Sequence, residues 1–318
     1  MSPFDFSLVT APFRMQPGLR RVAVGTAQLT PSWPGSRHLR EKIAVLGAFT
    51  DQALAAVPGF DPMPALRALA REASLAEATA FVIDESGSGP RWHAPRIGWS
   101  VGDDGASGRG DEAIGSLLGA LPEAQRPIAL LCLAFEEDFA VIDGATALVP
   151  WLAVCLPSHW APENKVGRHF GAIHAPVADS ATLIAAGESL ARLVTSGERW
   201  ERFVWTLSPD ARLHQHPARD AWPWPAAETG PMGAAAFFRS ERQTFIPVPG
   251  TTQAVFTIHV ETLRLDDPSF DAGAARRVHD ALASMSPAVL AYRGLAEARA
   301  DLLAWLAARA KGDSSPQP

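Results

Sequence analysis

Gln253-Ala-Val-Phe-Thr-Ile-His-Val-Glu-Thr-Leu263 is the longest β-strand signal in the chain, and it decides the fold class. Successive side chains of a strand point to opposite faces, so alternate residues share one environment. One face carries Phe256, Ile258 and Val260, and the other carries Thr257, His259 and Glu261. The stretch therefore predicts a strand with a polar triplet on one side of a sheet.

Further strand signals precede this stretch in the chain. Residues 202–207 alternate, with Phe203, Trp205 and Leu207 on one face, and residues 239–249 lead across Gly250 into the long strand. Short strands at 81–84 and 97–101 are predicted to form a hairpin-like unit. Residues 128–135 and 148–156 are apolar on both faces, and they are predicted as two central strands, or as one central strand and one edge strand.

Apolar residues at spacings of three and four indicate helices near both ends of the chain. The predicted helices cover residues 36–57, 64–80, 178–194, 272–285 and 288–311. No internal repeat and no linker-like stretch is visible. We therefore expect one α+β domain, in which a mostly antiparallel sheet of about five or six strands is flanked by N-terminal and C-terminal helices.

Composition and charge disfavour several classes of protein. The 318 residues are 47% apolar, which is typical of a well-folded chain. The chain has 34 acidic and 28 basic residues, and its formal charge of −6 disfavours nucleic acid and anionic membranes as partners. We find no signal peptide and no apolar run of about 18 residues, so a cytoplasmic protein without a membrane span is expected. Cys132 and Cys155 lie in apolar runs and are expected in the core.

Residues 157–177 are dense in histidine, because they hold His159, His169 and His174 out of nine in the chain. The spacing of these histidines is not that of the zinc motif H-E-x-x-H, which makes a zinc site in this stretch an unfavoured interpretation. The stretch also lacks the G-x-S-x-G elbow of serine hydrolases. Glycine loops that bind phosphate are absent as well, so nucleotide chemistry is not supported.

The local sequence offers two interpretations of His174. Residues 163–173 are predicted to form a short helix, on which Lys165 and His169 share a face but His169 and His174 do not. His174 follows Ile173 and precedes Ala-Pro-Val, which is an apolar setting. That setting favours a hydrogen-bonded core histidine, and it also suits an axial ligand of haem iron.

A second polar stretch begins at Arg239. In an extended chain Arg239, Glu241 and Gln243 share one face, while Arg242 points to the other. Two arginines that bracket a carboxylate could anchor a buried acid such as a haem propionate. A solvent-exposed strand with surface ion pairs is the alternative.

Several short motifs, in this order, resemble the α subunit of haem-dependent oxidative N-demethylase. The motifs are Gly18-Leu19, Pro157-Ser-x-Trp160, Lys165-x-Gly167, Ile173-His-Ala-Pro-Val177, Glu241-Arg-Gln243 and Phe256-Thr-Ile258. The resemblance covers roughly residues 10–305, and several motifs in one order are more specific than any single motif. Two departures are visible: His259 stands where an arginine is expected in the family, and the chain has a single tyrosine.

The resemblance implies a PAS-like sheet flanked by helices, forming a single haem-binding domain at residues 1–311. The chain end at 312–318 is expected to be a disordered tail. It also implies haem b in this chain, dioxygen as a reactant and a small secondary amine such as dimethylamine as substrate. Electrons would arrive from a separate reductase subunit that carries FMN and a 2Fe–2S cluster. The expected activity is that of a monooxygenase that releases an aldehyde and the shorter amine.

The resemblance also implies roles for individual residues. His174 is the expected ligand of the haem iron, and His169, Lys165, Arg239 and Arg242 are the expected cofactor-binding residues, the last three as partners of the propionates.

Glu241 and His259 are the expected catalytic residues, because a cationic amine needs an acceptor or a base nearby. Two rival functions stay open on the sequence alone. One is a PAS-like haem sensor or carrier without turnover, and the other is a scaffold that binds a small molecule without iron.

Overall fold

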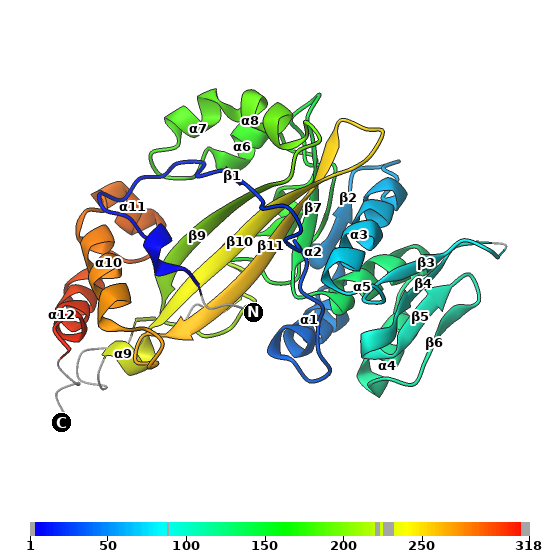
Figure 1. Ribbon diagram of the computed structural model, residues 1–318, viewed down its shortest axis with the longest axis horizontal. Helices are drawn as coiled ribbons and strands as arrows, with labels where there is room; N and C mark the ends of the chain where they lie inside the picture. Colours follow the sequence, from blue (N-terminus) through cyan, green and yellow to red (C-terminus); the bar gives the residue numbers. More distant parts are fainter. Residues whose placement is uncertain (1–3, 88, 220–222, 225–231, 313–318) are drawn as a thin grey trace.

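Strand β11 (Gln253–Arg264) lies inside a seven-stranded antiparallel sheet, paired with β10 (Phe237–Pro247) on one side and β7 (Asp138–Asp143) on the other. The computed structural model describes residues 4–87, 89–219, 223–224 and 232–312. The strand order is β1-β9-β10-β11-β7-β8-β2 (Figure 1). The outer strands are β1 (Arg20–Arg21), β9 (Trp200–Ser208), β8 (Trp151–Ala153) and β2 (Leu54–Ala56).

A second, four-stranded antiparallel sheet lies at one end of the molecule, away from helices α10 to α12 (Figure 1). Its strands follow one another in chain order: β3 (Val82–Asp84), β4 (Arg91–Ala94), β5 (Trp99–Gly102) and β6 (Gly105–Gly108). The buried side chains of Trp92 and Val101 join the same apolar core as Phe139 and Val260 of the large sheet. The two sheets are therefore held together by shared apolar burial.

The helices lie before, between and after the strands. In the first half they are α1 (Arg37–Ala48), α2 (Thr50–Ala53), α3 (Met63–Ala76), α4 (Glu112–Ala120) and α5 (Arg126–Ala134). In the second half they are α6 (Phe170–His174), α7 (Ala181–Ala185), α8 (Gly187–Val194), α9 (Met232–Ala235), α10 (Ala272–Ala283), α11 (Pro287–Tyr292) and α12 (Arg299–Ala310). Short 3-10 turns are η1 (Phe6–Leu8), η2 (Pro95–Ile97), η3 (Glu123–Gln125) and η4 (Pro162–Asn164).

Capping residues explain where several of these helices begin. The Ser36 hydroxyl accepts a hydrogen bond from the Leu39 amide at 3.2 Å at the start of α1. The Asp271 carboxylate accepts one from the Ala274 amide at 2.8 Å at the start of α10. Each cap satisfies an amide that the helix itself leaves unpaired.

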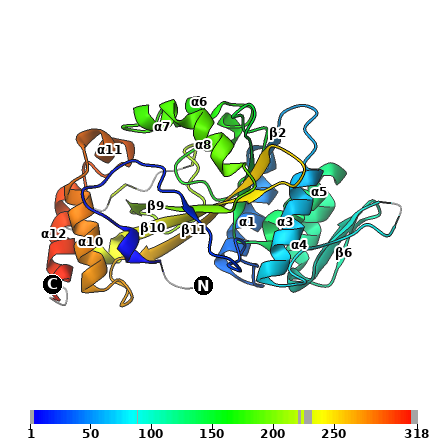
Figure 2. The ribbon, with the colours of Figure 1, turned by 45° about the horizontal axis from the view of Figure 1, so that its top comes forward.

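The large sheet has two faces, which we name after the helices that cover them. Residues that lie opposite one another in neighbouring strands point to the same side. On the α6 face, Gln243 lies opposite Arg202 and Ile258, whereas on the α1 face Arg242 lies opposite Phe203 and His259. Helices α6, α7 and α8 lie over the first of these faces (Figure 2).

Each face is packed by different segments. On the α6 face, buried Phe245 contacts an apolar cluster that includes Phe170 and Ile173 of α6. On the α1 face, Phe238 and Trp205 pack with α10 and α12, while α1 and α3 cover the other end of the strands. The polar residues of the two faces differ as well: Arg202, Glu241 and Gln243 lie on the α6 face, whereas Arg242 and His259 lie on the α1 face.

The antiparallel α+β architecture that the sequence predicts is confirmed, as are the strands corresponding to β9, β10 and β11. Residues 128–135 are the clearest error, because they form helix α5 rather than a strand. A segment that is apolar all round is equally compatible with a completely buried helix, and Ile128 to Phe135 are all buried. The next strand, β7, was not predicted.

Other boundaries also differ. The helix predicted at 163–173 is wrong, since only η4 and α6 form and Gly167 between them has φ +73°. The helix predicted at 36–57 ends at Ala48 and is followed by α2 and β2. Both sheets have more strands than predicted. The large sheet has seven strands rather than five or six, and the strands predicted at 81–84 and 97–101 belong to a four-stranded sheet rather than to a hairpin. Residues 313–318 of the predicted tail lie outside the described residues.

Among the residues that the structure describes, no helix combines the length and apolar character that crossing a bilayer requires.

Candidate functional site

The candidate site lies on the α6 face, where residues 157–177 approach strands β9 and β10. His169 begins α6 and caps it, because its Nδ1 accepts a hydrogen bond from the Gly171 amide at 3.1 Å. Lys165 lies before α6, and its Nζ donates to the carbonyl oxygen of Ile173 at 3.3 Å. These two predicted cofactor-binding residues, His169 and Lys165, thus hold the local structure that carries His174.

His174 is the last residue of α6, and its hydrogen bonding fixes which ring nitrogen is available. Its Nδ1 donates to the carbonyl oxygen of Phe170 at 2.8 Å, so Nε2 carries the lone pair. The Phe170 ring lies 4.1 Å away between centroids. Burial lowers the pKa of His174, and the charges of Arg202 and Lys165 act in the same direction. A neutral imidazole with one nitrogen bonded to a carbonyl is the usual form of a metal-binding histidine.

Two buried donors on β9 lack partners on the same face. The Nε1 of Trp200 and the Nε of Arg202 have no hydrogen-bond partner among the described residues, and both atoms are hidden from solvent. The two side chains share the α6 face because they lie two residues apart on one strand. Burial lowers the pKa of Arg202, and the charge of Glu241 opposes that effect. Unsatisfied buried donors in a native protein point to a missing acceptor such as a bound anionic group.

Glu241 is a buried carboxylate in the same region, with 9% of its surface exposed. The Gln243 Nε2 donates to its Oε2 at 2.6 Å, and the Ser158 hydroxyl donates to its Oε1. These two contacts fix the carboxylate in position. A fixed buried carboxylate is a suitable partner for a cationic ligand.

Arg239 has a different surrounding from the one expected of a propionate partner. Its guanidinium donates to the Ser158 Oγ at 2.8 Å and to the carbonyl oxygens of Arg212 at 2.9 Å and Leu213 at 2.7 Å. Burial lowers the pKa of Arg239 to about 10, against the opposing charge of Glu241. Every guanidinium nitrogen of Arg239 has a partner in the chain, so none is left for a propionate. Arg239 instead links residues 157–158 to residues 212–213.

Arg242 and His259 lie opposite each other on the α1 face, away from His174. The Arg242 Nε donates to Glu201 at 3.0 Å, and its Nη1 donates to the Ala27 carbonyl oxygen at 3.1 Å. His259 Nε2 lies 3.2 Å from Glu136. The residues that the sequence grouped into one site are therefore divided between the two faces of the sheet.

Sequence reasoning missed Trp200 and Arg202 as site residues. The alternation of β9 was visible, but it does not tell which face of β9 joins the Glu241 face of β10. That relation depends on the register, in which Arg202 lies opposite Gln243. His38 and Glu136 were missed for a similar reason, since they approach His259 from segments far away in the chain.

A family model matches the part of the chain that contains the α6-face residues. The family model described as haem-dependent oxidative N-demethylase, alpha subunit-like, matches residues 112–303. This match covers well over half of the chain and includes β7 to β11, α6 and all of the residues discussed on the α6 face. The chain therefore belongs to the family of haem-dependent oxidative N-demethylase alpha subunit-like proteins.

Proposed function

We propose that this chain is the haem-binding subunit of a monooxygenase that oxidatively demethylates a small secondary amine of the dimethylamine type. The observation that carries the proposal is the free Nε2 of a neutral His174, which shares the α6 face with the buried, unpaired donors of Trp200 and Arg202. Membership in a family described as haem-dependent supports the same cofactor.

The residues of the α6 face fit the needs of haem b. Haem requires an axial ligand, an apolar wall and donors for two propionates. His174 offers the ligand, and Phe170, Ile173 and Phe256 belong to the apolar cluster beside it. Arg202 and Trp200 offer donors that no group in the described chain uses. We therefore propose Arg202 in place of Arg242 as a propionate partner, with Lys165 nearby as a further cation.

Glu241 is the proposed site for the substrate. Haem, when bound, supplies the dioxygen and electron-transfer chemistry of the reaction. A secondary amine is cationic at neutral pH, and the Glu241 carboxylate would accept a hydrogen bond from its ammonium group. Gln243 and Ser158 hold that carboxylate, so the amine nitrogen would be oriented rather than merely attracted. The same carboxylate offers a place for the ammonium proton when the amine must become neutral.

A partner subunit is part of the proposal. The family description as an alpha subunit supports a multi-subunit enzyme. The described chain contains no glycine loop of the dinucleotide-binding type, so reducing equivalents would come from elsewhere. We propose a reductase with FMN and a 2Fe–2S cluster in that role.

The domain organisation is also proposed. We infer a single domain over residues 1–311 with a PAS-like arrangement of the large sheet. The continuous apolar core that includes residues of both sheets supports one domain, and the helices over an antiparallel sheet support the PAS-like description.

The decisive experiment combines a spectrum with a turnover assay. Purified protein supplied with haem b should show a strong Soret band at one haem per chain, and a cognate reductase with NADPH should release formaldehyde from dimethylamine. A Soret band without release from several methylamines would favour the sensor or carrier. Absence of haem binding would refute the proposal and favour a scaffold that binds a small molecule without iron.

A further inference from the structure

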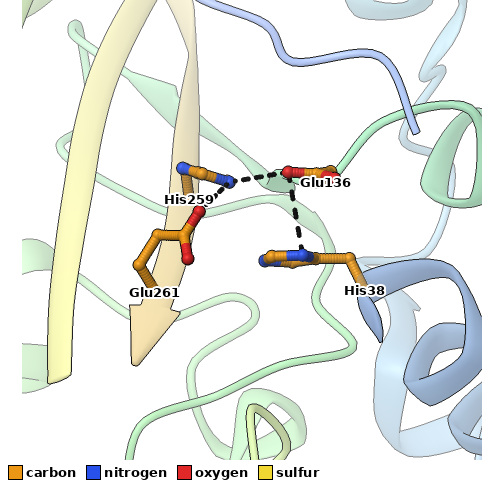
Figure 3. A group of neighbouring side chains, drawn as sticks. All are labelled: His38, Glu136, His259 and Glu261. Carbon is orange, nitrogen blue, oxygen red and sulfur yellow. Dashed lines mark hydrogen bonds and ion pairs between the residues drawn. The ribbon is translucent and has the colours of Figure 1, made fainter. Parts of the chain in front are cut away.

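A second cluster of ligand-type side chains lies on the α1 face of the sheet, separate from the site around His174. It consists of His38 from α1, Glu136 from the turn between α5 and β7, and His259 and Glu261 from β11 (Figure 3). Each residue contributes one ligand atom, and all four atoms lie within 4.8 Å of one another. We name these four residues the α1-face cluster.

Three of the distances within the cluster are close to those of a metal site. His259 Nε2 lies 3.2 Å from Glu136 Oε2 and 3.6 Å from Glu261 Oε1, and His38 Nδ1 lies 3.7 Å from Glu136 Oε2. Tetrahedral zinc with ligands at about 2.1 Å separates neighbouring ligand atoms by about 3.4 Å. The cluster therefore needs only small side-chain adjustments to surround one ion.

The hydrogen bonding of His38 directs a lone pair into the cluster. Its Nε2 lies 2.7 Å from the carbonyl oxygen of Val260, so in the neutral ring Nε2 carries the proton and Nδ1 does not. Nδ1 then faces an oxygen of Glu136, and neither atom can donate to the other. A cation between them removes this conflict. A backbone carbonyl behind the ring is also the usual way in which proteins orient a metal-binding histidine.

Burial and charge favour a divalent cation. The His38 and His259 side chains are 8% and 2% exposed, Glu136 is 13% exposed, and Glu261 reaches solvent at 44%. Two carboxylates and two neutral imidazoles carry a charge of −2, which a divalent ion neutralises. Lys42, Arg37 and Glu137 are further charged residues whose fields reach the cluster. Buried Lys42 is already paired with Asp138 at 3.3 Å.

We propose that His38, Glu136, His259 and Glu261 bind a divalent transition-metal ion of the zinc type. Two imidazoles and two carboxylates form a ligand set that suits Zn²⁺, and four protein ligands leave no open position, which is typical of a structural site. The ion would join α1 to β11 and to the turn after α5. His38 lies outside the residues that the family model matches, so the ion would tie the N-terminal part of the chain to the family region.

An ion pair without metal is the competing explanation. In that case His259 is protonated and donates a hydrogen bond to Glu136. Burial lowers the pKa of His259, but the hydrogen bond to Glu136 and the charges of Glu137 and Glu261 together raise it above its usual value. This explanation leaves His38 Nδ1 facing Glu136 Oε2 at 3.7 Å, which is too long for a hydrogen bond. The two explanations differ in what happens when zinc is added.

The test is a titration of the full chain with Zn²⁺, with and without haem, measured by calorimetry and by X-ray absorption at the zinc edge. We expect one zinc per chain, two imidazole ligands and a higher melting temperature when zinc is present. His38→Gln and His259→Gln should each weaken zinc binding by about a hundred-fold or more. Since haem iron has a different absorption edge, the result is independent of haem binding.

Two further variants guard against misfolding and stray binding. Glu261→Gln keeps the shape of a half-exposed side chain, so it should fold normally and still weaken zinc binding. His279→Gln, at an exposed pair with Asp280, should leave binding unchanged. Stoichiometric zinc binding that survives in the His38→Gln/His259→Gln double variant, or no binding at millimolar zinc, would overturn the proposal.

Discussion

The Nδ1 of His174 donates a hydrogen bond to the carbonyl oxygen of Phe170, one helical turn earlier, at 2.8 Å. This contact decides the tautomer of the ring and leaves Nε2 as the only nitrogen that can bind iron. It also makes the short helix α6 the element that positions the proposed ligand.

His174 is expected to be the sole histidine of residues 157–177 that affects the haem iron. His174→Ala should abolish or strongly shift the Soret band of haem-loaded protein, because the axial nitrogen is lost. His169→Asn is the matched control, since asparagine keeps the cap of α6 and should leave the spectrum unchanged. An unaltered band in the His174→Ala protein would show that another residue binds the iron.

Arg202 and Arg242 provide a test of which face of the sheet holds haem. Arg202→Leu should weaken haem binding by about ten-fold to a hundred-fold, the effect of losing one hydrogen bond between charged groups. Arg242→Leu removes the same charge from the next strand but on the other face, where Arg242 is paired with Glu201. Haem titrations of both variants measure the difference. The reverse order of effects would place haem on the α1 face.

Glu241 is expected to govern amine binding but not haem binding. Glu241→Gln keeps the size of the side chain and removes the charge that attracts the ammonium group, so dimethylamine should bind about ten-fold or more weakly. Amine titration followed through the haem absorption measures this change. Glu85→Gln removes an exposed carboxylate beside the small sheet, outside both proposed sites, and should not alter amine affinity. Equal effects of the two variants would argue against a specific role of Glu241.

His214 is expected to make stability fall in mild acid. Burial lowers its pKa below 6.5, against the hydrogen bond from Nδ1 to the Cys155 carbonyl oxygen at 2.7 Å. The unfolded chain therefore takes up the proton first, and the free energy of unfolding contributed by His214 falls as pH drops from 6.5 towards the lower folded-state pKa.

Urea unfolding at about pH 7.5 and about pH 5.5 measures this contribution. His214→Gln should lose less stability between the two pH values than the unaltered chain does. Comparing the two proteins cancels the opposing contributions of buried carboxyl groups such as Glu72 and Glu137, whose pKa values burial raises. An identical loss in both proteins would show that His214 does not contribute.

The strands β9, β10 and β11 could be predicted from the sequence because alternation has a period of two, which no helix produces. The histidine-rich stretch at 157–177 and the pair Arg239 and Glu241 were likewise visible as unusual local groupings. Residues 128–135 could not be assigned, because a segment that is apolar on all sides gives the same pattern whether it becomes a buried strand or a buried helix.

Local sequence determined which side chains alternate along each strand, and tertiary structure decided which of them meet. The alternation of β10 places Arg239 and Arg242 on opposite faces, but only strand pairing and packing bring Arg239 to Ser158 and Arg242 to Glu201. His38 and His259 are 221 positions apart, and their rings stack 5.2 Å apart only because α1 packs on β11. Side-chain direction follows from the two-residue repeat of one strand, whereas contact between distant segments depends on register and on the burial of the whole core.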